Sequence, residues 1–210
     1  MKGPRKLANS SGFSSIELII AMLIMLTIMG VVSSLFSKAL TTRLRESSRT
    51  DALTSAQAAL NVISREISNS GYGLTGNGIV VADSDPGKLH FFSNITNTNE
   101  IFTDPGENLT YYYDAGTRSI LRYDRNGSGV GVAQTSIIVN RISSLSFLYY
   151  DALGTNPPTV PSLTPSVNTA RVRVTIGVLL EQVVGQANPQ SVTLVSDVTL
   201  RNSDYMLRQY

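Results

Sequence analysis

The sequence predicts an α+β protein in which one long N-terminal helix packs on an antiparallel β-sheet. Proline is absent between Pro4 and Pro86, and glycine is absent between Gly30 and Gly71, which predicts an uninterrupted helix over about residues 13–69. Toward the C-terminus, apolar and polar residues alternate with a period of two, which is typical of strands that bury one face of a sheet.

The first part of the predicted helix is long and apolar enough to cross a bilayer. Residues 18–37 carry no charge and are mostly Leu, Ile, Val and Met. At about 1.5 Å per residue this run spans roughly 30 Å, the thickness of the hydrocarbon core of a membrane. We therefore expect residues 13–37 to form a transmembrane half of the helix, after a short basic leader over residues 1–12.

The second part of the helix, residues 38–70, is predicted to be amphipathic. Its apolar residues recur at steps of three and four, so they share one face, while most charged residues lie elsewhere. The residues of this stripe are Leu53, Ala56, Leu60, Ile63 and Ile67. We expect the stripe to be buried against the domain that follows.

Residues 71–210 are predicted to form a β-rich globular head. A glycine-rich segment, 71–78, leads out of the helix, and four prolines make residues 152–169 a solvated loop. The strand-like runs are residues 79–82, 89–92, 109–113, 119–123, 137–139, 141–150, 171–180 and 191–200. Tyrosines in these runs either pack across the sheet, as strand aromatics usually do, or belong to a contact surface.

The composition argues against several functional classes. The chain has no cysteine, which excludes thiol catalysis and disulfides, and its single histidine, His90, lies in the strand-like run "KLHFF". The net charge of +2 becomes −1 without the leader, because Lys2, Arg5 and Lys6 lie there, so a nucleic-acid surface is not indicated. We expect no catalytic residues, no cofactor and no enzymatic activity.

One segment resembles half of a calcium-binding loop. In "YDRNGSG", Asp124 and Asn126 could supply two oxygen ligands. Calcium takes six to eight oxygens, and no Glu follows to complete the set. A turn between two strands is the favoured interpretation, and calcium binding remains the alternative.

Glu17 is unusual because it stands at the head of the apolar run, where a charge costs about 2.5 kcal/mol or more. One explanation is a helix N-terminal carboxylate stabilised by the helix dipole. Another follows if the chain is cut between Gly12 and Phe13. The new amine of one subunit could then reach Glu17 of a neighbour, and two charges about 4 Å apart attract by about 4 kcal/mol at an effective dielectric of 20.

Gly12, Phe13 and Glu17, with the basic leader and the apolar run, resemble the type III signal sequence of bacterial type IV prepilins and type II secretion pseudopilins. The resemblance implies that a prepilin peptidase cuts after Gly12 and N-methylates Phe13. It also implies that Glu17 is the assembly carboxylate. Ser15 stands where the family usually has Leu.

A second resemblance concerns the segment "SAQAALNVISREISNSGYGLTG" and the terminal strands, which are similar to those of PilW-type minor pilins and of GspJ-type pseudopilins. It implies a type IV pilin-like fold and a structural subunit of a pilus or of its initiation or tip complex. The implied partners are the prepilin peptidase, other minor pilins, the major pilin and the inner-membrane assembly platform. The implied location is the bacterial inner membrane, with a single pass and a periplasmic head, and then the pilus or pseudopilus.

Three alternatives remain open at this point. A GspJ-like pseudopilin of a type II secretion system has the same signal. A Sec-secreted soluble β protein would be cut after Ala39, although its apolar region of about twenty residues exceeds the usual 7–15. An uncleaved membrane protein would keep Met1. The first residue of the mature protein, Phe13, one near Leu40, or Met1, separates pilin-type processing from the other two.

Overall fold

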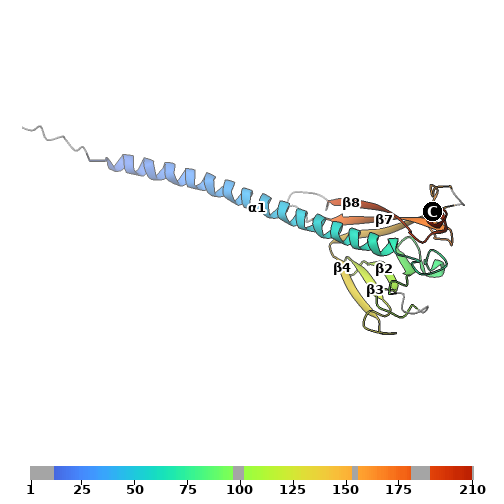
Figure 1. Ribbon diagram of the computed structural model, residues 1–210. Coiled ribbons are helices and arrows are strands. Elements are labelled where there is room, and N and C mark those ends of the chain that lie inside the picture. The colour runs from blue at the N-terminus through green and yellow to red at the C-terminus, as the bar shows by residue number, and fades with distance from the viewer. Residues whose placement is uncertain (1–11, 97–101, 153–155, 181–189, 210) are drawn as a thin grey trace, which may run out of the picture. The chain divides into compact units, whose positions relative to one another are not determined.

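The computed structural model describes residues 12–96, 102–152, 156–180 and 190–209, and the chain forms two compact units, Met1–Glu46 and Ser47–Tyr210. Helix α1, Ser15–Ser68, is 54 residues long and runs through both units (Figure 1). It confirms the predicted helix over residues 13–69. Without an internal proline, no backbone N–H is lost and no ring clashes with the preceding turn, so the helix continues unbroken.

Within the second unit, α1 buries one face. The buried residues of the helix are Ala52, Ala56, Ala59, Leu60, Ile63 and Ile67. Four of the five predicted stripe residues are therefore buried, and the fifth, Leu53, is partly buried and packs against the same core. The amphipathic stripe is confirmed.

Within the described ranges, eight strands form two antiparallel sheets. The first sheet has the order β1 (Lys88–Phe92), β2 (Asn108–Asp114), β3 (Ser119–Asp124) and β4 (Gln134–Val139). The second has the order β6 (Pro161–Ser162), β5 (Ile142–Asp151), β7 (Thr169–Leu179) and β8 (Ser191–Thr199). A 3-10 turn, η1 (Val81–Asp83), and a short helix, α2 (Asp204–Leu207), complete the described elements.

The α+β class is confirmed, but the strands divide between two sheets where the sequence predicted one. The division falls between β4 and β5, which only two residues separate, and one of them, Arg141, has a positive φ of 60°. This left-handed conformation turns the chain sharply. Val139 therefore ends the first sheet, and Ile142 begins the second.

The predicted strand over residues 79–82 is wrong. Ile79 makes an isolated bridge to Phe91, and the chain then enters η1. The hydroxyl group of Ser84 accepts a hydrogen bond from the His90 N–H at 3.0 Å and donates one to the His90 carbonyl at 3.1 Å. The Val80 N–H also donates to the His90 carbonyl, at 2.9 Å, so pairing with β1 is limited to the bridge at Ile79 before the chain turns into η1.

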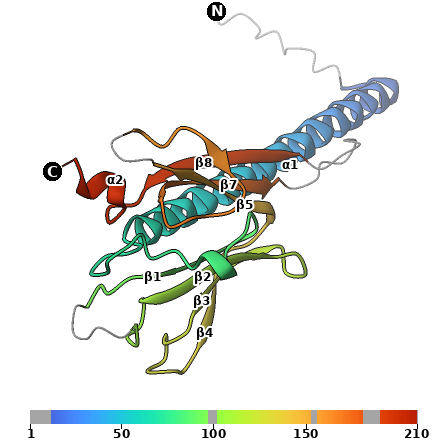
Figure 2. The ribbon, with the colours of Figure 1, turned by 90° about the vertical axis from the view of Figure 1, so that its right-hand side faces the viewer.

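One hydrophobic core joins the buried face of α1 to both sheets. In both views, β7 and β8 lie on one side of the second half of α1, and β2, β3 and β4 lie on the other (Figures 1 and 2). The alternation predicted in β7 is confirmed, because Val172, Val174, Ile176 and Val178 are all fully buried. Their even spacing places them on the inner face of the sheet.

Candidate functional site

The N-terminal end of α1 has one of the two hydrogen bonds of a capping box. Ser14 precedes the first helical residue, and its carbonyl accepts the Leu18 N–H at 3.2 Å. The Glu17 carboxylate reaches back and accepts the Ser14 N–H through Oε2, also at 3.2 Å. This is the geometry of a Ser-x-x-Glu cap, in which the acid satisfies an N–H that the helix leaves unpaired. Glu17 therefore stabilises its own helix end within a single subunit.

Gly12 and Phe13, the residues on either side of the predicted cleavage site, are both exposed. The Phe13 side chain is 85% accessible, and nothing described lies within 4 Å of the position that a Cβ at Gly12 would occupy. Both residues precede the helix, so the bond between them is in a non-helical segment. The rest of the predicted leader, residues 1–11, lies outside the described residues.

The apolar half of α1 is uncovered. Every residue from 12 to 44 is exposed, including the large side chains of Ile24 and Leu26. The helix is long and apolar enough to span a membrane, and none of its most apolar window is buried. The core helix of a soluble domain would instead be covered by its own chain.

A buried polar cluster holds the other half of α1 against the first sheet. The Tyr111 hydroxyl donates a hydrogen bond to Glu66 Oε2, and Arg122 Nε donates to the same oxygen at 3.0 Å. Arg122 Nη1 also donates to Asp124 Oδ2 at 3.3 Å. These bonds link the helix to β2 and β3 through charged groups that are mostly withdrawn from water. Sequence reasoning missed this cluster, although Glu66 directly precedes a stripe residue, Ile67.

The protonation states of the cluster favour the hydrogen bonds that hold α1 against the first sheet. Burial raises the pKa of the Tyr111 phenol, and the negative charge of Glu66 raises it further, so the hydroxyl remains a donor. Burial by itself lowers the pKa of the Arg122 guanidinium, but the charge of Glu66, the hydrogen bond to it and the nearby Tyr111 and Asp124 together outweigh burial, and the net shift is upward. The two donors thus stay protonated beside one carboxylate.

The Asp124 and Asn126 oxygens are engaged in the turn itself. Asp124 Oδ2 accepts the Gly106 N–H at 2.8 Å, and its Oδ1 accepts the Asn126 N–H at 3.1 Å. Asn126 Oδ1 accepts the Gly131 N–H at 2.9 Å. These are the bonds of an Asx-type turn. In the described part of the chain, no three His, Cys, Asp or Glu side chains group as a metal site.

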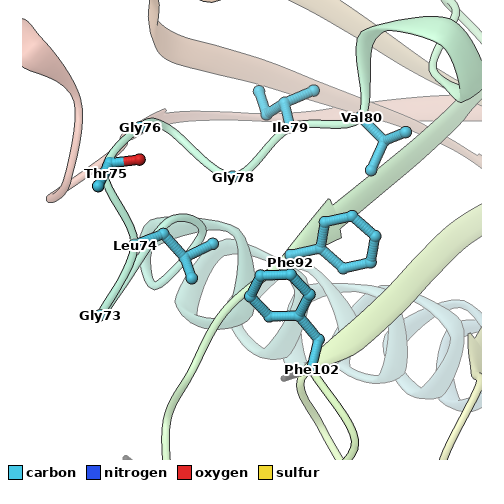
Figure 3. A pocket seen from close by; sticks show the side chains of 9 residues that line it. All are labelled: Gly73, Leu74, Thr75, Gly76, Gly78, Ile79, Val80, Phe92 and Phe102. Carbon is cyan, nitrogen blue, oxygen red and sulfur yellow. The ribbon is translucent and has the colours of Figure 1, made fainter. Parts of the chain in front are cut away.

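A cavity of about 610 Å³ lies beside the segment that follows α1 (Figure 3). Its walls are residues 73–76 and 78–80 and two aromatic rings, Phe92 and Phe102, which stack at 4.7 Å between centroids. Gly78 has a φ of +75°, and a Cβ there would lie 2.3 Å from the Gly71 nitrogen. The residues that line it are apolar apart from the Thr75 hydroxyl, and none of them is charged.

No protein-family model, curated protein or solved structure is similar enough to this chain to match it. What the chain does must therefore be argued from its own residues. The site that they build best is the N-terminal half of α1, with Gly12, Phe13 and Glu17 at its head.

Proposed function

We propose that this protein is a minor pilin of the PilW type, a structural subunit of a type IV pilus or of its initiation or tip complex. The proposal rests mainly on one contrast. Gly12, Phe13 and Glu17 head an apolar helix half that is fully exposed, while the β-rich head covers the other half of the same helix. A subunit of this kind inserts in the membrane through the first half of the helix and carries its head on the second half.

The exposed apolar half of α1 is stabilised when its side chains are removed from water. Burying one large aliphatic side chain contributes about 1.5–3 kcal/mol, and the surface from residue 16 to residue 44 carries many of them. A bilayer covers such a helix before assembly. In a filament, the apolar helices of neighbouring subunits take its place. The partners are then other minor pilins and the major pilin, delivered by the inner-membrane assembly platform.

Glu17 links processing to assembly. In the single subunit only Oε2 has a hydrogen-bond partner among the described residues, which leaves Oε1 able to accept a second donor. Cleavage after Gly12 by a prepilin peptidase would create an amine on Phe13, with a pKa of about 8, that is mostly cationic at neutral pH. At 4 Å this amine and a neighbour's carboxylate attract by about 4 kcal/mol at an effective dielectric of 20. The pair offsets the cost of a carboxylate in an apolar bundle.

The location that follows is the bacterial inner membrane, with one pass and the head in the periplasm, and later the filament. The function is assembly and involves no catalysis. A GspJ-like pseudopilin would use the same helix in the same way. A cut after Ala39 by signal peptidase would leave the buried stripe, residues 52–67, intact, so the fold of the head alone does not separate that alternative.

The test is the N-terminal residue of the mature protein. Mass spectrometry of the protein purified from membranes of cells with an active prepilin peptidase is expected to find N-methylated Phe13. Gly12→Lys should leave the leader attached, because the peptidase must approach the backbone closely, and Gly12→Ala should be cut at the same bond. A wild-type protein that keeps Met1, or one that begins near Leu40, would contradict the proposal.

A further inference from the structure

A second cavity, of about 380 Å³, lies on the outer face of β1, β2 and β3. Thr110 on β2 pairs with His90 on β1 and with Tyr123 on β3, so these three side chains project from the same face. Tyr112 follows two residues after Thr110, on that face as well. None of the residues that line the cavity belongs to α1.

One side of the cavity is held rigid by ionic hydrogen bonds. Asp83 accepts a hydrogen bond from Lys88 and lies 2.8 Å from His90 Nδ1 through its second oxygen. His90 Nε2 lies 2.9 Å from Asn108 Oδ1. The hydrogen bond from Lys88 lowers the pKa of the Asp83 carboxyl, and His90 lowers it further. This side therefore presents a fixed carboxylate, an amide and an ammonium group.

The other side carries polar groups that are not engaged. The hydroxyls of Thr110, Tyr112 and Tyr123 and the guanidinium of Arg125 line the cavity. Among the described residues, none of these four side chains makes a hydrogen bond or an ion pair. Thr110 is nevertheless only 6% exposed. A small ligand in the cavity would meet three hydroxyl groups and one guanidinium fork.

The lining suits a ring that carries both hydroxyl groups and a carboxylate. The guanidinium of Arg125 matches a carboxylate with two parallel donors. The rings of Tyr112 and Tyr123 offer flat apolar surface, while Asp83 and Asn108 provide acceptors for ligand hydroxyls. Lys88 and Arg125 outweigh Asp83, so the formal charge of the lining is positive, with His90 counted as neutral. The volume is near the lower end of ligand cavities, about 300–1,000 Å³, and suits one or two rings.

We propose that this cavity binds an acidic sugar, a pyranose ring that bears a carboxylate. An acidic peptide is the competing ligand. Extended peptides commonly bind by adding a strand to an open sheet edge. The cavity lies instead on the face of the sheet, across β2, and both edges of β2 are already paired with β1 and β3. The geometry therefore favours a compact ring over an extended chain.

The test uses the full chain in an amine-oxide detergent, because maltoside headgroups are themselves sugars. Titration calorimetry and saturation-transfer NMR should detect D-glucuronate with a Kd on the order of 1 mM, which is typical of a small ligand with few contacts. Glucose and acetate, which each lack one of the two features, should bind at least tenfold more weakly. Weak binding of both compounds would show that the cavity recognises the ring and the carboxylate together.

Variants locate the binding. Arg125→Gln should weaken glucuronate binding by about tenfold or more, since it removes a charge-assisted hydrogen bond. Arg201→Gln, at an exposed arginine outside the cavity, is the matched control and should bind as wild type. Tyr123→Phe should weaken binding less than Tyr123→Ala, because the phenylalanine keeps the ring.

Three results would overturn the proposal: no glucuronate binding, an equal loss in Arg125→Gln and Arg201→Gln, or tighter binding of a triglutamate peptide than of glucuronate. The last would assign the cavity to acidic peptides. None of these results bears on N-terminal processing, so the sugar site and the pilin assignment fail separately.

Discussion

The two halves of α1 are one continuous helix with opposite surroundings. Residues 18–37 are uncharged, apolar on all sides and exposed, whereas residues 52–67 carry a narrow apolar stripe that is buried. The more hydrophobic half is thus the one that its own chain leaves uncovered. A helix that is apolar all round belongs in a membrane or inside an assembly, while a striped helix belongs on the surface of a folded domain. The contrast supports the proposal that a membrane or neighbouring subunits cover the first half.

The buried half also differs in how it meets its neighbours. Ala52, Ala56 and Ala59 are small, which lets the helix approach the core closely. Polar contacts then tie it to each sheet: Ser64 Oγ donates to Ser196 Oγ of β8 at 3.0 Å, and Glu66 accepts from β2 and β3. Directional bonds of this kind specify one position for the helix on the head.

The largest expected difference between the halves comes from truncating one isoleucine in each. Ile63→Ala should lower the free energy of unfolding of the head by about 2–5 kcal/mol, because it leaves a cavity in a fully buried site. Ile24→Ala, at an exposed site, should change it by less than about 0.5 kcal/mol. Urea unfolding in micelles, followed by near-UV circular dichroism of the tyrosines, measures both. Equal losses would contradict the division of the helix.

Two glycines sharpen the same comparison. Gly78→Ala should destabilise the head by about 1–3 kcal/mol, because φ is +75° and the new Cβ would lie 2.4 Å from the Phe92 carbonyl oxygen. Gly30→Ala has open space around it and lies in the exposed half. It should leave unfolding of the head unchanged and favour the helix locally. Thermal unfolding of the two variants in the same detergent decides this, and a destabilising Gly30→Ala would count against the account.

Removing the charge of Glu66 should have a moderate effect. Glu66→Gln keeps the shape but leaves Arg122 with a weaker partner in a site where each side chain is about four-fifths buried. We expect a loss of about 1–2 kcal/mol in unfolding free energy, below the value for a fully buried pair. Asp51→Asn, at an exposed acid on the same helix, is the matched control. A similar loss in both variants would show that the cluster does not anchor the helix.

The smallest effect is a pH dependence from Asp83. Its pKa is lowered from 3.8 by the hydrogen bond from Lys88, so the folded state binds this proton less readily than the unfolded state. The stabilisation is present above the unfolded pKa and is lost as the pH falls through the folded pKa. Asp83→Asn should therefore show a slightly smaller fall in melting temperature than wild type between about pH 5 and pH 3. An identical fall in melting temperature would show that the Asp83 carboxylate does not contribute to the pH dependence of stability.

Local features of the fold were predictable because each depends on neighbours in sequence. The absence of proline and glycine predicted α1, the three–four spacing predicted its buried face, and the alternation of Val172, Val174 and Ile176 predicted the inner face of β7. The division into two sheets was not predictable in this way. A period of two says which side chains are buried but not which strands pair, and the positive φ at Arg141 leaves no mark in a hydropathy pattern.

The candidate sites likewise differ in whether the sequence alone could predict them. The motif at Gly12, Phe13 and Glu17 is compact in sequence, so it could be recognised before the structure was known. The cluster of Glu66 and Arg122 joins residues 56 positions apart, and the sugar cavity joins three strands. Only the register of the strands brings such residues together. His90 illustrates the point, because the strand was predicted but its partners were not.

The central claim is that Glu17 serves assembly as well as its own helix end. The decisive measurement is the amount of this protein in sheared filaments relative to that in the membrane, for wild type, Glu17→Leu, Glu17→Asp and the control Asp51→Leu. Because Glu17→Leu removes a costly charge, membrane insertion should persist. Cleavage after Gly12 should persist as well, because the cut lies more than a helical turn upstream of residue 17.

The account predicts a much lower filament-to-membrane ratio for Glu17→Leu, an intermediate one for Glu17→Asp and a normal one for Asp51→Leu. If the subunit sits at the tip, the defect appears as fewer filaments, so their number per cell is counted as well. An unchanged ratio together with an unchanged number of filaments for Glu17→Leu would contradict the claim. The carboxylate would then act only as the helix cap that accepts the Ser14 N–H.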